Sequence, residues 1–341
     1  FVLSCFPVKF NLMMMETCSS PEDKPSMFVI ITSFTIPGME CIIGIIGNSF
    51  IMVTNGAEWV QNRKFSTGGR ILFFLSSSRI ALQSCMMMES FTSLIFPSFY
   101  KEDTIYDIFK VVFMFLTFCS LWFATWLNIF YFVKIANFNH PLFLRLKWRI
   151  TELMPWLLWS SVIISFCYSV LFYQQVYYTS CNHSIPDPFS NSTKKKYIIN
   201  TNVINLAIIY NVGMFIPLIL FMLAAILLII SLKRHTLQME SNTTGSRNPS
   251  MEAHIRAIKS ISSFLILYIF NFVALLLYMS NIFDDDSFWI VFCKIIIAAF
   301  PSGHSVLLIL GNPKLRNTWG RFQHQIWSCY FSSCSWTLSG K

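Results

Sequence analysis

Residues 204–232 read INLAIIYNVGMFIPLILFMLAAILLIISL, a run of 29 residues without a charged side chain. A helix rises about 1.5 Å per residue and the hydrocarbon core of a bilayer is about 30 Å thick, so about 20 such residues cross it. The run is too long for a membrane strand and does not alternate between apolar and polar residues. It therefore predicts a transmembrane helix.

Six further apolar runs divide the rest of the chain at loop-sized intervals. The weakest of them, residues 71–96, contains Arg79, Gln83 and Glu89, so its hydropathy alone leaves a membrane span in doubt. The complete set of runs covers residues 28–54, 71–96, 106–133, 152–173, 204–232, 261–281 and 288–310. The sequence thus predicts an all-α membrane protein built as a bundle of seven helices.

The composition points to lipid as the solvent of this chain. Of its 341 residues 55% are hydrophobic and only 12% are charged, which leaves too little polar surface to cover a soluble core. The formal net charge is +9, but the basic residues lie between the apolar runs and form no aromatic-interleaved patch, so nucleic-acid binding is not expected.

The ten cysteines are scattered and show no metal-ligand spacing, so neither a metal site nor any other cofactor is predicted. Several lie in apolar runs and are expected to be small core residues, among them Cys85, Cys119, Cys167 and Cys293. Cys18 and Cys181 lie in polar segments, where the sequence cannot pair them.

The loops differ in positive charge, which predicts the orientation. The segments on one side hold 16 Lys and Arg residues and those on the other side hold 6. The more basic loops face the cytosol. The sequence thus predicts an extracellular segment at residues 1–27, a transmembrane domain at residues 28–310 and a cytosolic tail at residues 311–341. No cleaved signal peptide is expected, since no small-residue cleavage site precedes the first run.

Glycosylation acceptors agree with this orientation. Asn182 (Asn-His-Ser) and Asn191 (Asn-Ser-Thr) lie in the predicted outer loop at residues 174–203. Asn242 (Asn-Thr-Thr) also matches the acceptor pattern, but it lies in a predicted cytosolic loop and is expected to be a chance match.

Ionisable residues inside the apolar runs leave other function classes open. Arg79, Glu89 and Lys294 could mark an ion path, as in a transporter or channel, although the two halves of the chain show no inverted repeat. His304 next to Ser305 raises the alternative of an intramembrane enzyme. Neighbours in a helix point about 100° apart, however, so these two side chains are not expected to face each other.

The first run contains GIIGN at residues 44–48, whose small residues allow helix backbones to approach closely. Asn48 is expected to form hydrogen bonds between helices, and its role is either packing alone or signalling.

Five ordered motifs resemble one receptor family. The most specific is LWFATWLNIFYFVKIANF at residues 121–138; the others are LSSSRIAL (75–82), SLKRHTLQM (231–239), GSRNPSMEAH (245–254) and PSGHSVLLILGNPKL (301–315). Together they are similar to the bitter taste receptors over about residues 34–320. The chain departs from the family at Ser84, where many members carry a Trp. It lacks the acidic-Arg-aromatic triplet of most rhodopsin-like receptors.

The resemblance implies a chemosensory receptor of the plasma membrane that binds bitter compounds and activates a gustducin-type heterotrimeric G protein; it leaves the oligomeric state open. It implies ligand contacts at Phe113, Thr117, Asn271 and Lys294 in the outer half of the bundle. Lys294 could instead reach the outer interface or pair with the acidic residues 284–286.

Activation and coupling are expected at other residues. The resemblance places Arg79 against the first and seventh helices and implies structural or activation roles for Asn48, Arg79, His304 and Ser305. Basic residues cluster at the inner ends of the third, fifth and sixth helices and are expected to contact the G protein or anionic lipid: Lys134, Lys147, Lys233, Arg234, His235 and Lys259.

Overall fold

The computed structural model describes residues 27–63, 66–100, 103–136, 140–183, 192–241, 249–279 and 288–338. All regular elements within these ranges are α-helices. They are α2 (Met27–Asn62), α3 (Thr67–Ile95), α4 (Pro97–Tyr100), α5 (Asp103–Ile135), α6 (Pro141–His183), α7 (Ser192–Ser241), α8 (Pro249–Met279), α9 (Phe288–Gly311) and α10 (Pro313–Leu338).

Seven of these helices are long and apolar enough to cross a membrane. The candidate spans lie in α2, α3, α5, α6, α7, α8 and α9, which confirms the predicted all-α bundle with seven spans. The helices extend beyond the predicted apolar runs. Helix α7, for example, has 50 residues, because backbone hydrogen bonding continues into polar sequence that hydropathy does not count as membrane.

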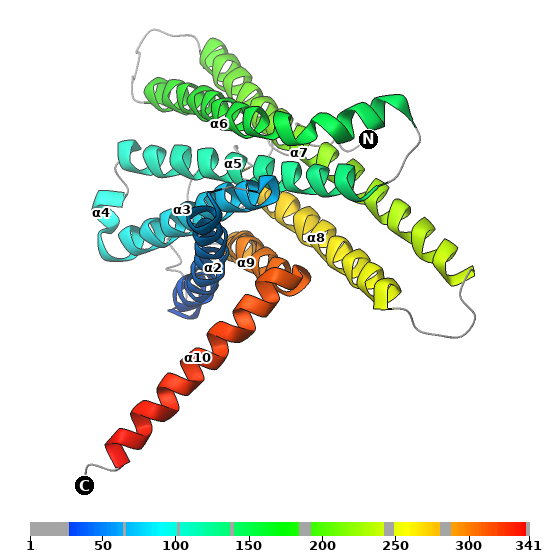
Figure 1. The fold of residues 1–341 in the computed structure, drawn as a ribbon. Helices are drawn as coiled ribbons and strands as arrows, with labels where there is room; N and C mark the ends of the chain where they lie inside the picture. Colours follow the sequence, from blue (N-terminus) through cyan, green and yellow to red (C-terminus); the bar gives the residue numbers. More distant parts are fainter. Residues whose placement is uncertain are drawn as a thin grey trace.

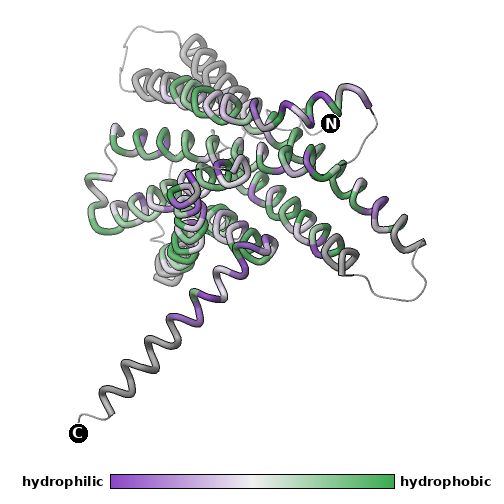
Figure 2. Tube along the Cα trace, in the orientation of Figure 1, coloured by the Kyte–Doolittle hydropathy of each residue, from purple (hydrophilic) through white to green (hydrophobic). Residues whose placement is uncertain are grey.

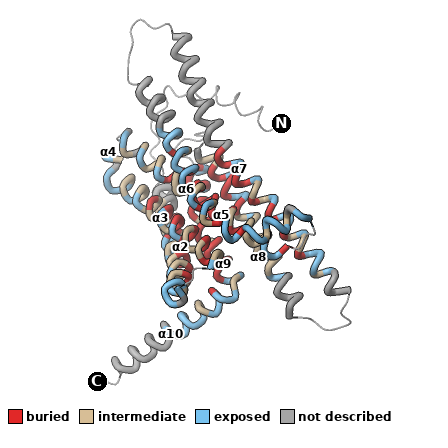
Figure 3. The backbone as a smooth tube through the Cα atoms, turned by 45° about the horizontal axis from the view of Figure 1, so that its top comes forward, coloured by how far each residue is buried: buried red, intermediate tan, exposed pale blue. Residues whose placement is uncertain are grey.

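Helix α5 lies in the middle of the bundle, where it contacts α3, α6 and α7 (Figure 1). Helix α2 packs against α3 and α9, and α8 packs against α7 and α9. Buried residues gather where α2, α3, α5, α7 and α9 meet (Figure 3). The α4 end of the bundle, where α3 is followed by α5, is opposite to the α10 end, where α9 is followed by α10 (Figure 1).

The doubtful second run forms a complete helix. Helix α3 begins after Ser66, whose hydroxyl accepts a hydrogen bond from the backbone N–H of Gly69 at 3.1 Å. Its polar residues Arg79 and Gln83 are both 0% exposed, so they face the interior of the bundle. The apolar residues of α3 are therefore free to face lipid and neighbouring helices, which hydropathy averaged along the sequence cannot show.

Residues 311–341 were predicted only as a tail, and most of them form α10. Proline suits the first turn of a helix because the N–H it lacks has no partner there. Leu315 is buried, and the ring of Trp319 meets that of Phe50 in α2 edge to face at 4.9 Å. Lys314 forms an ion pair with Glu58 of α2. The first turns of α10 are hydrophilic, so the hydropathy of the segment gave no sign of its packing (Figure 2).

The cysteine predictions were mostly confirmed. Cys85, Cys119 and Cys293 are free and buried in the core. The prediction for Cys167 was wrong, because its position on α6 leaves it exposed on the surface of the bundle. Cys18 and the side chain of Cys181 lie outside the described residues.

Candidate functional site

A buried polar cluster in the bundle centres on Arg79. Its Nη1 lies 2.8 Å from Nδ1 of His304 in α9, and its Nε donates to Oγ of Ser120 in α5 at 3.3 Å. A guanidinium group can only donate, so Nδ1 accepts and the proton of the neutral imidazole ring is on Nε2. The guanidinium also lies 5.3 Å from the centre of the Phe300 ring. Arg79 thus joins α3, α5 and α9.

One turn further along α3, Gln83 joins a second chain of hydrogen bonds. Its Nε2 donates to Oγ of Ser302 at 3.0 Å, and this hydroxyl lies 2.6 Å from the main-chain oxygen of Glu40 in α2. Ser305 donates to the main-chain oxygen of Ser302 at 2.8 Å. Helices α2, α3 and α9 are therefore linked through Ser302, a residue that sequence reasoning quoted in a motif but did not single out.

Two glycines of α2 make this close approach possible. A Cβ atom on Gly44 would overlap the Gln83 amide and lie 2.5 Å from Oγ of Ser302, and a Cβ on Gly47 would lie 2.7 Å from Oγ of Ser305. Asn48 does not form the expected bond between helices in this structure, because its Nδ2 donates to the main-chain oxygen of Gly44 within α2 at 2.8 Å. Its Oδ1 is buried without a partner among the described residues.

Gly44→Ala is expected to destabilise the receptor by about 1–3 kcal/mol, because the added methyl group overlaps Gln83 and Ser302 and pushes both side chains away from α2. Thermal unfolding of the purified protein in detergent measures the loss. Gly38→Ala in the same helix is the matched control, since a Cβ there meets nothing within 4 Å. Adding Gln83→Ala to Gly44→Ala removes the overlapping amide and should recover part of the loss; an equal loss in Gly38→Ala would contradict the steric explanation.

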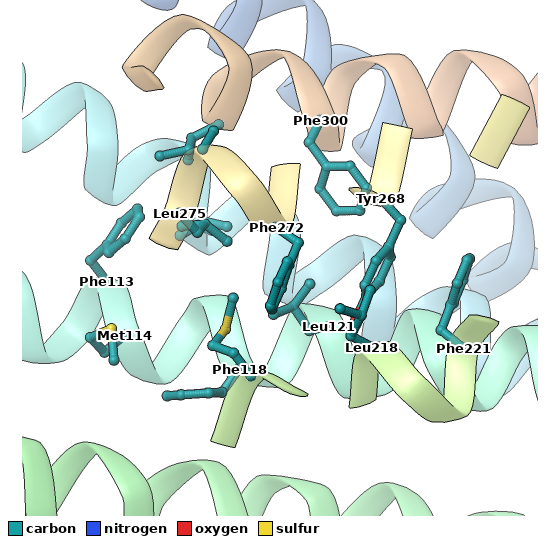
Figure 4. Close-up of a cluster of buried hydrophobic side chains, with 14 of the residues drawn as sticks. Phe113, Met114, Phe118, Leu121, Leu218, Phe221, Tyr268, Phe272, Leu275 and Phe300 are labelled. Carbon is teal, nitrogen blue, oxygen red and sulfur yellow. The ribbon is translucent and has the colours of Figure 1, made fainter. Parts of the chain in front are cut away.

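A column of aromatic rings connects the Arg79 cluster to α7. Phe221 of α7 stacks on Tyr268 of α8 with ring centres 4.3 Å apart, and Tyr268 meets Phe300 of α9 edge to face at 5.8 Å (Figure 4). Phe300 lies in turn against Arg79. The column was not predicted, since each of its three rings lies on a different helix and the sequence shows only three separate apolar runs.

Two side chains of α5 bind the backbone of α7 beside this column. Thr125 Oγ1 donates to the main-chain oxygen of Leu121 at 2.8 Å and lies 3.2 Å from that of Pro217. Asn128 Nδ2 donates to the main-chain oxygen of Phe221 at 2.9 Å. Pro217 lies inside α7 and has no N–H, so the helix lacks one internal hydrogen bond there. The hydrogen bonds from α5 hold α7 at this weakened turn.

The predicted ligand residues lie toward the α4 end of the bundle. Phe113 meets the ring of Tyr278 edge to face at 6.1 Å, and the Lys294 ammonium group lies 5.9 Å from the centre of the same ring. Tyr278 therefore joins residues of α5 and α9 from its place on α8. Sequence reasoning missed it, and its position seven residues after Asn271, two helical turns along α8, was the only available signal.

The other two predicted ligand residues are buried polar groups. Thr117 is 5% exposed, and its Oγ1 has no hydrogen-bond partner among the described residues. Asn271 is 3% exposed. Their helices, α5 and α8, supply Phe113, Phe118, Phe272 and other residues to one hydrophobic cluster (Figure 4). Unpaired polar groups within such a cluster are suited to hydrogen-bond a ligand.

The predicted coupling residues lie at the α10 end of the bundle. Lys233, Arg234 and His235 are exposed on α7, as is Lys259 on α8. Lys134 is exposed and lies 6.0 Å from the centre of the Phe130 ring. Lys147 differs from them, because its Nζ donates to the main-chain oxygen of Ala136 at 3.0 Å, just beyond the last residue of α5. A cation there stabilises the carboxyl-terminal end of that helix.

The structure gives little support to the other function classes. His304 and Ser305 have different partners, Arg79 and the backbone of Ser302, so they form no nucleophile and base pair. Glu89 accepts a hydrogen bond from Tyr100 at 2.9 Å, whereas Lys294 lies over Tyr278; no contact joins either of them to Arg79. Within the described ranges no three His, Cys, Asp or Glu side chains could hold a metal ion.

The predicted glycosylation sites lie mostly beyond the described ranges. Asn191 and Asn242 lie outside the described residues, and Asn182 is described only through its backbone in the last turn of α6.

A family model described as taste receptor protein (TAS2R) matches residues 25–328. The chain belongs to the taste receptor family. It is 55% identical over 338 residues to taste receptor type 2 member 39 of Homo sapiens, covering 98% of this chain and 99% of that protein. It is 54% identical to the Macaca mulatta protein of the same name over the same shares, and 49% identical to that of Mus musculus over 87% of this chain and 92% of that protein.

Membership of the TAS2R family confirms the resemblance to the bitter taste receptors, and it makes the chain a multi-pass membrane protein of a receptor family and not an enzyme. The match to the human relative covers 98% of the chain, so it includes much of residues 1–27, which exceed the short outer terminus expected of the family.

Proposed function

We propose that this chain is a G-protein-coupled receptor of the plasma membrane that binds bitter compounds at the α4 end of its bundle and activates a gustducin-type heterotrimeric G protein at the α10 end. The observation that carries the proposal is the buried, unpaired hydroxyl of Thr117, one helical turn after Phe113, whose ring contacts the Tyr278 ring on which Lys294 also lies. Small-molecule sites combine apolar walls with a few polar groups in this way.

The signal travels between the two ends through contacts on several helices. A ligand that binds one packing of the bundle more tightly than another shifts the population toward that packing. Phe272 belongs to the same hydrophobic cluster as Phe113. The same cluster contains the column of Phe221, Tyr268 and Phe300. A shift of Tyr268 therefore reaches both Arg79 and the turn of α7 held by Thr125 and Asn128.

The G protein meets the exposed basic residues of α7 and α8 and exposed Lys134 at the same end of α5. Replacing Lys233 and Arg234 together by alanine should lower agonist-stimulated G-protein activation by about tenfold at equal surface level, since two cations that meet an acidic partner are lost. A nucleotide-exchange assay with purified G protein measures the loss. Lys110→Ala, near the opposite end of α5, is the control; unchanged activation in the double variant would favour a role of these charges at anionic lipid alone.

The amino terminus lies outside the cell and the tail after α9 lies in the cytosol, as the asymmetry of 16 against 6 basic residues supports. Asn182 or Asn191 should then carry a glycan and Asn242 should not. Glycosidase digestion should therefore shift the electrophoretic mobility of the wild type and of Asn242→Gln, but not that of the variant lacking both outer sites. A shift that disappears only with Asn242→Gln would reverse the orientation.

Expression in cells that carry a promiscuous G protein, with calcium release as the readout, tests the proposed function. Several compounds of a broad bitter panel should release calcium only in cells that display the receptor. Silence across the panel with the receptor present at the surface would contradict the proposal. Solute flux that requires no G protein would replace it with a transporter.

A further inference from the structure

An arc of aromatic side chains at the α4 end connects two ionisable groups of opposite charge. Starting from α3, Glu89 accepts a hydrogen bond from the Tyr100 hydroxyl at 2.9 Å, and the Tyr100 ring lies 6.2 Å from that of Phe109. Phe109 is one helical turn before Phe113 on α5. Phe113 then contacts Tyr278, over which Lys294 lies. We call this set the outer arc: Glu89, Tyr100, Phe109, Phe113, Tyr278 and Lys294.

The two charged ends of the arc lie at the same depth in the bundle. Arg79 and His304 are in contact at 2.8 Å and mark a common level on α3 and α9. Glu89 follows Arg79 by ten residues, and Lys294 precedes His304 by ten residues on a helix that runs in the opposite direction. Ten residues of helix span about 15 Å, so both groups lie about 15 Å from that level, toward the α4 end.

Neither charge is neutralised by the other or by another described residue. Lys294 contacts the Tyr278 ring but forms no ion pair in the described part of the chain. Glu89 uses Oε1 to accept the bond from Tyr100, and within the same residues no cation lies against its carboxylate. Both side chains are partly exposed at the α4 end of the bundle, so a charged ligand can reach either of them. An opposite charge on the ligand would stabilise each group, which makes both ends of the arc suited to a charged ligand.

We propose that the outer arc reads the charge of the ligand at both ends: Glu89 binds a protonated amine, Lys294 binds a carboxylate or phenolate, and the rings between them contact the apolar body. The inference rests on the proposed function and adds Glu89 as a specificity-determining residue. The Tyr100 hydroxyl holds the Glu89 carboxylate in place through its hydrogen bond. The faces of the rings also attract a cation, which favours amines over neutral ligands.

Three compounds with the same apolar body and different charges test this assignment: phenylbutylamine, phenylbutanol and phenylbutanoic acid. Calcium release is measured for the wild type, Glu89→Gln and Lys294→Gln at equal surface level. Glu89→Gln should raise the half-maximal concentration of the amine by about tenfold or more and leave the other two within about twofold, since only a charge-assisted bond is lost. Lys294→Gln should do the same to the acid alone.

Two further variants test whether the effect of Glu89→Gln depends on its hydrogen bond to Tyr100 and not on charge elsewhere near the arc. Tyr100→Phe keeps the ring beside Phe109 but removes the hydrogen bond to Glu89, so it should weaken the amine by a smaller factor than Glu89→Gln. Lys101 follows Tyr100 in the sequence and lies outside the described residues; Lys101→Ala should leave the order of the three compounds unchanged.

The inference can fail while the proposed function stands. Equal shifts in the half-maximal concentration of all three compounds in Glu89→Gln, or no shift for the amine, would show that Glu89 does not select ligands by charge. Silence of the wild type toward all three, in cells where it responds to other bitter compounds, would exclude the arc as a surface for ligands of this size. Silence toward every compound of a broad panel would instead contradict the proposed function itself.

Discussion

Replacing Arg79 by alanine should abolish the response to every agonist. The guanidinium group is fully buried and joins α3 to His304 and Ser120, so its loss removes these hydrogen bonds from α3 to α9 and α5. Each buried partner left without a hydrogen bond costs about 1–3 kcal/mol, which is similar to the free energy that separates two packings of a bundle. Calcium release with agonists of different structure, at matched surface level, measures the effect.

Arg79→Lys is the matched control for charge. It retains the cation, but one ammonium group on a flexible stem does not reproduce the planar fork that reaches two partners. We therefore expect a large loss in this variant too, by at least about tenfold in potency. A variant at Arg79 that loses one agonist and keeps another at full efficacy would show that Arg79 contacts ligand and does not organise the inner bundle.

Lys294→Gln should weaken anionic agonists far more than neutral ones. A charge-assisted hydrogen bond contributes about 1.5–3 kcal/mol, which corresponds to roughly a tenfold to hundredfold change in potency. Lys294 contacts the Tyr278 ring and forms no ion pair among the described residues, so under the proposed function we expect its ammonium group to bind the ligand. Concentration–response curves for one anionic and one neutral agonist measure the difference.

Lys294→Arg separates charge from shape in this prediction. It keeps the cation above the Tyr278 ring, where a guanidinium group also stacks well, so the anionic agonist should retain most of its potency. Equal losses for both agonists in Lys294→Gln, or no loss for either, would remove Lys294 from the residues that read the ligand. A pairing of Lys294 with the acidic residues 284–286 would give the second outcome.

Sequence reasoning located the spans well because a membrane span is a local property. An uninterrupted apolar run such as residues 204–232 forms a helix in lipid, since a helix satisfies the hydrogen bonds of its own backbone. Even α3, with Arg79 and Gln83 in it, follows the rule once its polar residues face the bundle. The family was also readable, because its motifs are short ordered strings such as residues 121–138.

The partners of the buried polar groups depend on how the helices pack. Arg79 and His304 are 225 residues apart in the sequence, and nothing in either run shows that their side chains meet. Each helix can rotate about its axis and slide along its neighbour, and only the packing of all of them fixes the register. Gly44 shows this directly: its missing Cβ leaves the space that Gln83 and Ser302 fill.

The sequence by itself determined the seven apolar helices, their expected orientation and the taste receptor motifs, because these depend on composition, spacing and the asymmetry of charge along one chain. Only the tertiary structure decided that Tyr278 joins Phe113 to Lys294, that Lys147 caps α5 and that the tail forms α10 against Phe50. Each of these contacts brings together side chains from different helices or from a helix and a loop, and the free energy of such a contact exists only once both have packed.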